Sequence, residues 1–198
     1  MSKFTPMYGL TGGIASGKST ALQMFQTLGI PTVDADDVAR TVIAPGSEGH
    51  HALIDAIGPS FFDGEVLNRS KLRDAMYLDE TLKRAVEAVV HPRVRAEIDA
   101  WRARPSEAPY RILCSPLLLE TGQDQSLDGV IVIDVDPEQQ LDRAEVRDRR
   151  TRAQIQEILA HQLPREERRK RATYIIDNSS SEAALRTQIF ALHERLTA

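Results

Sequence analysis

A glycine-rich stretch near the N-terminus carries the clearest chemical signal in the sequence. Residues 12–19 read GGIASGKS and match the pattern GxxxxGKS/T, with an apolar run before them and a helical pattern after them. Glycines let a backbone wrap closely around phosphate oxygens, and N–H groups at a helix N-terminus favour bound anions. In such a loop Lys18 reaches the β- and γ-phosphates of a nucleotide, and Ser19 can bind Mg²⁺. The stretch therefore predicts a site for a nucleoside triphosphate.

Three aspartates follow the next apolar run, at residues 30–33. Asp34 and Asp36 point to the same side if the strand stays extended, and strand ends of this kind line the ligand crevice of a parallel sheet. A carboxylate there can accept a proton from an attacking hydroxyl or hold Mg²⁺ through water. We expect Asp36 to act in catalysis and Asp37 to cap the following helix, whereas both roles stay open for Asp34.

A further aspartate, Asp134, ends the apolar run 131–133 and resembles the acid that holds Mg²⁺ in many nucleotide-binding proteins. It comes late in the chain, and Asp136–Pro137 already accounts for a strand-to-helix turn here, so we expect Asp134 to be structural. A nucleotide-dependent switch or assembly ATPase that uses Asp134 is the alternative. The sequence has no guanine-reading tetrapeptide NKxD, which weighs against a GTPase.

The segment from Arg143 to Arg171 is rich in arginine. Arg143 and Arg147 are four residues apart and can share one helix face, where guanidinium groups suit phosphate oxygens. RNA binding is a weaker interpretation of this segment, because the chain lacks an obvious aromatic stacking motif. The later cations are expected to form a solvated face: Arg165, Arg168, Arg169, Lys170 and Arg171.

Short apolar runs alternate with helical patterns over much of the chain, which is typical of a parallel sheet with crossover helices. The predicted strands lie at residues 7–10, 30–33, 110–114, 130–135 and 174–176. Helical spacing is found at 18–28, around 38–43, after Asp136–Pro137 and in the closing segment to about residue 196.

Residues 47–104 differ from the rest, because helical patterns follow one another there without a strong strand. A turn is expected at Asp63–Gly64, and Pro92 predicts a helix break because proline disfavours helix at the residue before it. This stretch is interpreted as a helical insertion within one domain. His50 and His51 are expected on its surface.

Composition limits the class of protein further. A chain of 198 residues suits one domain, and a net charge of −4 gives no basic field for nucleic acid. Cys114 is the single cysteine, which excludes an internal disulfide, and we expect it to be buried. No apolar run reaches the ~20 residues of a membrane span, so we expect a cytoplasmic protein that acts on neither membranes nor nucleic acid.

A series of short motifs runs along the chain in a fixed order. The string LTGGIASGKST is followed by the DAD of residues 34–36 and by Arg40. Further motifs are His91–Pro92, Pro116–Leu117–Leu118 with Glu120, Asp134–Val135 leading to Leu141 and Arg143, and Ile176–Asp177–Asn178. In order and spacing these motifs resemble the dephospho-CoA kinase family, and the resemblance covers nearly the whole chain.

The resemblance implies an α/β fold of the P-loop NTPase type, in three α/β/α layers around a five-stranded parallel sheet. It implies one domain with a core at 7–45, 108–143 and 172–198, a helical substrate-binding insertion at about 47–104 and a helical lid at about 144–171. The implied reaction transfers the γ-phosphate of ATP, with Mg²⁺, to the ribose 3′-hydroxyl of dephospho-CoA. The protein would be a monomer or small homo-oligomer, and another P-loop small-molecule kinase, of the nucleoside or nucleotide type, is the alternative.

The resemblance also implies roles for individual residues. Asp36 would be the general base, with Lys18 and Arg143 as the catalytic cations and Ser19 on the metal. ATP would be bound by Gly13, Ile14, Ala15, Ser16, Gly17, Lys18, Ser19, Thr20, Arg147 and Asn178. Dephospho-CoA would be bound by Thr11, Asp34, Arg40, Arg69, His91, Pro116 and Leu117. Many relatives have glycine at the position of Ala15, and we expect no positive φ there.

Overall fold

The computed structural model describes residues 5–148, 151–160 and 162–198. The chain folds into two compact units, one of Met1–Val33 with Ser106–Ala198 and the other of Asp34–Pro105. Residues 149, 150 and 161 of the expected lid lie outside the described part. Within the described residues, no helix is both long and apolar enough to cross a membrane.

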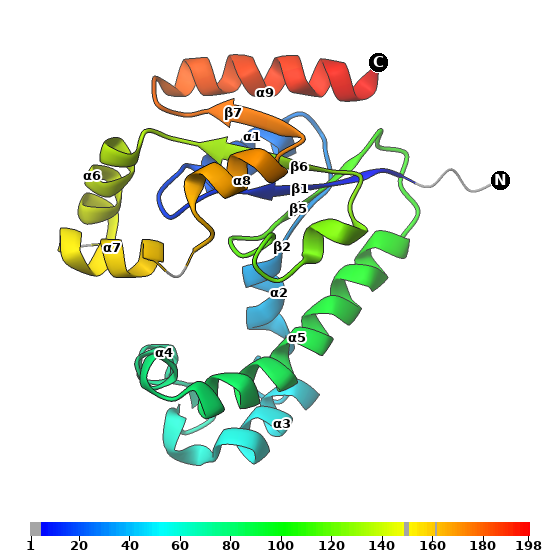
Figure 1. The fold of residues 1–198 in the computed structure, drawn as a ribbon. Helices are drawn as coiled ribbons and strands as arrows, with labels where there is room; N and C mark the ends of the chain where they lie inside the picture. The colour runs from blue at the N-terminus through cyan, green and yellow to red at the C-terminus, as the bar shows by residue number, and fades with distance from the viewer. Residues whose placement is uncertain (1–4, 149–150, 161) are drawn as a thin grey trace. The chain divides into compact units, whose positions relative to one another are not determined.

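A five-stranded parallel sheet forms the centre of the first unit, as predicted (Figure 1). Its order is β2-β5-β1-β6-β7, and the strands are β1 (Met7–Thr11), β2 (Thr32–Asp34), β5 (Arg111–Cys114), β6 (Gly129–Asp134) and β7 (Tyr174–Asp177). Leu10 lies opposite Cys114 on one neighbour of β1 and opposite Ile131 on the other. Most side chains of β1, β5 and β6 are buried, which explains why these strands read as continuous apolar runs.

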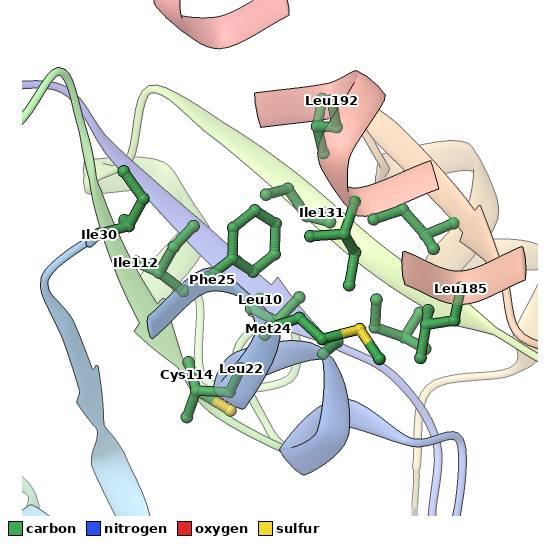
Figure 2. Close-up of a cluster of buried hydrophobic side chains, with 14 of the residues drawn as sticks. Leu10, Leu22, Met24, Phe25, Ile30, Ile112, Cys114, Ile131, Leu185 and Leu192 are labelled. Atoms are coloured by element: carbon green, nitrogen blue, oxygen red, sulfur yellow. The ribbon is translucent and has the colours of Figure 1, made fainter. Parts of the chain in front are cut away.

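One face of this sheet is covered by α1 (Lys18–Thr27) and α9 (Glu182–Thr197), which pack against each other. Phe25 of α1 and Leu185 of α9 meet Leu10 and Ile131 of the sheet in a single apolar cluster (Figure 2). Cys114 belongs to the same cluster and is buried, as expected.

The opposite face is covered by the segment after β5, which contains Leu118 and Leu127, and by α8 (Arg165–Arg171), which packs against β6. Gly9 faces this side, where a methyl group would lie 2.5 Å from Leu118 and 2.7 Å from Leu127. Because side chains alternate along a strand, Asp134 also points to this side, opposite to Ile133. The remaining elements of the first unit are the 3₁₀ helix η2 (Gln123–Ser126), α6 (Pro137–Asp148) and α7 (Arg152–Ala160), and α6 packs against α7. The three-layer arrangement is therefore confirmed.

The second unit is mainly helical. It contains α2 (Ala35–Val42), α3 (Glu48–Ile57), the 3₁₀ helix η1 (Pro59–Phe61), the short strands β3 (Phe62–Asp63) and β4 (Val66–Leu67), α4 (Arg69–Leu78) and α5 (Glu80–Ala103). The turn predicted at Asp63–Gly64 joins the two short strands, and Gly64 has φ 65°. Packing of α5 against α2, α3 and α4 gives the unit its core.

The predicted helix break at His91–Pro92 is wrong, because α5 runs through Pro92 without interruption. A proline inside a helix removes one hydrogen bond and costs about 3 kcal/mol, which the packing of α5 on three neighbouring helices offsets. The break falls at Asp79 instead. Its carboxylate caps α5 by accepting hydrogen bonds from the N–H groups of Thr81 and Leu82, at 2.8 and 3.0 Å.

The expectation for the histidine pair is half right. His51 is exposed, whereas His50 is buried, and its Nε2 lies 2.7 Å from the carbonyl oxygen of Glu65. His50 also packs edge-on against Phe62. A histidine that ties the hairpin of β3 and β4 to α3 is therefore a structural residue of the second unit.

Asp134 fixes α8 to the sheet through two arginines. Its carboxylate, on a residue only 5% exposed, accepts hydrogen bonds from Arg165 at 2.8 and 2.7 Å and also pairs with Arg169. Burial alone would raise the pKa of the Asp134 carboxyl, but the hydrogen bonds from the two arginines outweigh it and hold this pKa below its usual value. The structural role expected for Asp134 therefore has a definite physical basis.

Replacing the carboxylate of Asp134 tests this structural role. Asp134→Asn leaves two arginines without their counter-charge, so we expect the free energy of unfolding at pH 7 to fall by about 3 kcal/mol. The lowered pKa means that the carboxylate stabilises the fold above the usual carboxyl pKa of about 4, and that its contribution is lost as the pH falls through the folded-state value. Urea unfolding at several pH values measures both effects.

Asp136→Asn is the matched control. Asp136 is exposed and caps α6 by accepting from the N–H of Glu138 at 3.0 Å, a role that asparagine fills equally well. A loss of the same size in both variants, or a difference between wild type and Asp134→Asn that does not shrink in acid, would contradict the role given to Asp134.

Candidate active site

The glycine-rich loop joins β1 to α1, as predicted. Gly17 is the N-cap of α1 and has a left-handed backbone with φ 95°, which glycine adopts readily. The ammonium group of Lys18 turns back over the loop and donates hydrogen bonds to the carbonyl oxygens of Gly12 and Gly13, at 2.7 and 3.2 Å. Ser19 is exposed and Thr20 half-buried in the first turn of α1. This is the strand, loop and helix that a phosphate site requires.

The expectation that Ala15 avoids positive φ is wrong, because its φ is 54°. A left-handed backbone costs a residue with a Cβ about 1–2 kcal/mol. Ala15 and the neighbouring Ile14 pack against a small apolar cluster of Leu141, Ala144 and Ile155, and this contact offsets the cost. Alanine is also small enough to leave the loop backbone in place.

Asn178 connects the loop to the ends of two strands. It is buried, and its side-chain Nδ2 donates to the carbonyl oxygen of Ser16 at 2.8 Å. Its backbone N–H donates to the carbonyl of Asp134 at 2.7 Å, and its own carbonyl accepts from Arg143 at 2.9 Å. A methyl group at Gly17 would lie 2.2 Å from Nδ2, so glycine is required for this close approach. The structure thus brings together Ser16, Gly17, Arg143 and Asn178 from the residues predicted to serve ATP.

Two glutamines that the sequence analysis missed hold the peptide groups of Ile14. Gln140 is buried on α6, and its Nε2 donates to the carbonyl of Ile14 at 2.8 Å. Gln162 lies between α7 and α8, and its Oε1 accepts from the N–H of Ile14 at 3.1 Å. The sequence does offer one indication of the role of Gln140, because this residue adjoins Leu141 on the apolar side of α6. A polar residue in such a place needs a partner.

The arginines of α6 and α8 differ in how far they are exposed to solvent and in their ion-pair partners. Arg143 is half-buried beside Asn178, whereas Arg147 is exposed and pairs with Asp148 at 2.7 Å. The prediction of a solvated face on α8 is wrong for most of its members. Arg168 is buried, and Arg165 and Arg169 hold the buried Asp134. Arg171 is exposed and pairs with Asp124 at 2.7 Å.

The aspartates of the second unit divide their roles differently from the prediction. Asp34, and not Asp37, caps α2, because its Oδ1 accepts from the N–H of Asp36 at 2.8 Å. Asp37 instead pairs with Arg40 at 2.5 Å, one helical turn away. The side chain of Asp36 lies exposed on the first turn of α2. The other predicted side chains of this unit, Arg69 at the start of α4 and His91 on α5, are also exposed.

The remaining predicted substrate residues lie at the carboxyl ends of β1 and β5 in the first unit. Thr11 is buried, and its Oγ1 donates to the carbonyl of Pro116 at a long 3.5 Å. Leu117 is 45% exposed, although it follows a buried strand. Large apolar side chains in such a position can contact a ligand.

The donors near the loop fit a magnesium ion held mostly by a nucleotide. Among the residues that the structure describes, no group of three or more His, Cys, Asp or Glu side chains could hold a metal. Mg²⁺ at nucleotide sites takes one or two protein oxygens and completes its shell with phosphate and water. The exposed hydroxyl of Ser19 offers one such oxygen.

A parallel sheet with helices on both faces, and a glycine-rich loop with its lysine at the start of α1, define a P-loop nucleotide-binding protein of the kinase type. The comparisons then make the assignment specific. The dephospho-CoA kinase family model matches residues 7–192, and the chain belongs to this family of ATP-dependent phosphotransferases.

Individual relatives agree with the family match. A dephospho-CoA kinase of Shewanella oneidensis is 39% identical over 197 residues, which are 98% of this chain and 94% of that protein. A solved structure from Thermus thermophilus has a TM-score of 0.87 and 31% identity, and the match covers 99% of this chain and 100% of that one. The structure of a dephospho-CoA kinase from Campylobacter jejuni has a TM-score of 0.72 and 25% identity, with 96% of each chain covered.

The hydrogen bond from Asn178 to the loop can be tested by one isosteric change. Asn178→Asp replaces the Nδ2 donor with an oxygen that faces the carbonyl of Ser16, so the loop loses a partner and gains a repulsion. We expect the dissociation constant for ATP to rise at least about 10-fold, measured by isothermal titration calorimetry.

Asn68→Asp serves as the control for this experiment. Asn68 caps α4 in the second unit by accepting from Lys71 at 3.0 Å, and aspartate caps helices equally well. ATP binding should be unchanged in this variant. Wild-type affinity in Asn178→Asp would show that the loop does not depend on Asn178.

Proposed function

We propose that this protein transfers the γ-phosphate of ATP to the 3′-hydroxyl of the ribose of dephospho-CoA, giving CoA and ADP. The single observation that carries the proposal is a family match over residues 7–192 in a chain whose phosphate loop is complete. Phosphoryl transfer depends on positioning and on neutralising charge, and the loop, Lys18 and Arg143 supply both. A cytoplasmic monomer or small homo-oligomer is part of the proposal.

We assign the general base to Asp36. Its carboxylate is exposed on the first turn of α2, directly after a strand of the parallel sheet, where the motif of the family places an acid. Asp36 would accept the proton of the 3′-hydroxyl as the hydroxyl oxygen attacks phosphorus. Asp34 caps α2 and would thereby orient the turn that carries the base.

Other residues would bind the two substrates. In the first unit, the loop residues Gly13 to Thr20 would surround the phosphates, with Arg147 and Asn178 as further ATP ligands. Ser19 would hold Mg²⁺, which would offset part of the negative charge of the phosphates when bound. For dephospho-CoA we propose contacts from Thr11, Asp34, Arg40, Arg69, His91, Pro116 and Leu117. The helical unit would select the acceptor, and residues 144–171 would form the lid.

The reaction is tested by measuring ADP formation from ATP and Mg²⁺ with and without dephospho-CoA. We expect strong stimulation, and a product heavier than dephospho-CoA by one phosphoryl group in mass spectrometry. No stimulation, in folded protein that binds ATP, would contradict the proposed acceptor and direct attention to nucleosides and nucleotides.

Two substitutions test the assigned chemistry. Asp36→Asn removes the base, and kcat should fall at least about 100-fold, the usual effect of losing general-base catalysis. Lys18→Met removes the cation over the loop and should reduce turnover by at least a similar factor. Steady-state kinetics with dephospho-CoA measures both variants.

Asp37→Asn is the control, because Asp37 makes an exposed pair with Arg40, and such pairs contribute little. It should retain activity within about 3-fold. The assignment of the base fails if Asp36→Asn keeps the wild-type kcat, or if Asp37→Asn loses as much as Asp36→Asn.

A further inference from the structure

Arg168 occupies an unusual place for an arginine of a surface helix. It lies in the middle of α8 and is only 6% exposed, with its guanidinium group against the phosphate loop. A methyl group at Gly13 would lie 2.9 Å from Nη2 of Arg168 and 2.3 Å from Nε2 of Gln140. Glycine at this position is therefore what lets the guanidinium reach the loop backbone.

The charge of Arg168 has no carboxylate partner at ion-pair distance within the part of the chain that the structure describes. Its neighbours on α8 differ, since Arg165 and Arg169 share Asp134 and Arg171 has an aspartate of its own. Arg168 donates a hydrogen bond from Nη1 to the neutral carbonyl of Leu163, at 2.5 Å. Burial lowers the pKa of its guanidinium, and the charges of Glu120 and Asp134 only partly oppose this effect.

Such a buried and incompletely neutralised cation is costly to the fold unless an anion completes its surroundings. Lys18 indicates where such an anion would bind. Its ammonium group donates to the carbonyls of Gly12 and Gly13, so two cations, Lys18 and Arg168, lie next to Gly13. The lysine of this motif reaches the β- and γ-phosphates, which places Arg168 at the terminal end of the triphosphate.

We propose that Arg168 binds the γ-phosphate of ATP and is a further catalytic residue of the phosphotransfer. The planar donor fork of a guanidinium matches the oxygens of a phosphoryl group, on which negative charge is spread during transfer. The bond from phosphorus to ADP breaks, the bond to the acceptor oxygen forms, and the proton goes to Asp36, so Arg168 exchanges no proton. This role rests on the proposed function.

The test compares nucleotides that differ in the γ-phosphate. Arg168→Met keeps much of the volume and removes the charge. We expect its affinity for the non-hydrolysable analogue AMP-PNP to fall at least about 10-fold while its affinity for ADP stays within about 3-fold, as expected for loss of a charged hydrogen bond to one phosphate. With dephospho-CoA, kcat should fall at least about 100-fold.

Lys170→Met is the matched control, because it removes one positive charge from the same helix. Lys170 is exposed and pairs with Glu167, so nucleotide affinity and kcat should be unchanged. Arg168→Lys keeps the charge without the fork, and we expect about a 10-fold lower kcat with normal ADP binding. This variant carries the test if Arg168→Met does not fold.

A scaffolding role for Arg168 gives a different result. Arg168→Met would then weaken AMP-PNP and ADP equally, or lower the melting temperature without changing kcat, and either result would overturn the proposal. Wild-type kcat in Arg168→Lys would do the same if the Met variant is unfolded. Failure of the proposed function is separate, since the wild type would then make no CoA while the comparison of AMP-PNP with ADP still reports on Arg168.

Discussion

A glycine-rich loop has few side chains with which to fix its own shape, and this one depends on amides that come from far along the chain. Asn178 donates to the carbonyl of Ser16, and Gln140 donates to the carbonyl of Ile14. Gln162 accepts from the N–H of Ile14. All three amides follow β6 in the sequence, so the hydrogen bonds that hold the phosphate loop come from the C-terminal half of the first unit. Local sequence supplies the glycines, and tertiary structure supplies the conformation.

Asp134 contacts both Asn178 and the helix α8, which lies next to Gln162 in the sequence. Its backbone carbonyl accepts from the N–H of Asn178, and its carboxylate holds Arg165 and Arg169 of α8. Asp134 thereby holds the backbone of Asn178, whose side chain binds the loop, and it also holds α8. Asp134 ends a β-strand where many nucleotide-binding proteins carry a metal-binding acid, but here its carboxylate is engaged by arginines. The carboxylate of Asp134 therefore serves to fix α8 to the sheet.

The sequence predicts the parts of this protein that local patterns determine. The five strands, the loop and the start of α1 follow from apolar runs and a motif, although β2 begins two residues later than the run at 30–33. Errors arise where distant contacts decide. Pro92 stays helical because α5 is packed on its neighbours, Ala15 adopts positive φ against the cluster of Leu141, and Arg168 is buried by tertiary packing. The run of charged residues in α8 does not reveal its ion-pair partners, because these lie on other elements.

We expect the amides of Asn178, Gln140 and Gln162 to hold the phosphate loop in place before nucleotide binds. Amide hydrogen exchange of the nucleotide-free protein tests it most directly. We expect residues 12–17 to exchange at least about 10-fold more slowly than an unstructured chain, and Asn178→Ala to remove this protection while α9 stays protected. Exchange of the wild-type loop at the unstructured rate, or a loop unaffected by Asn178→Ala, would contradict it.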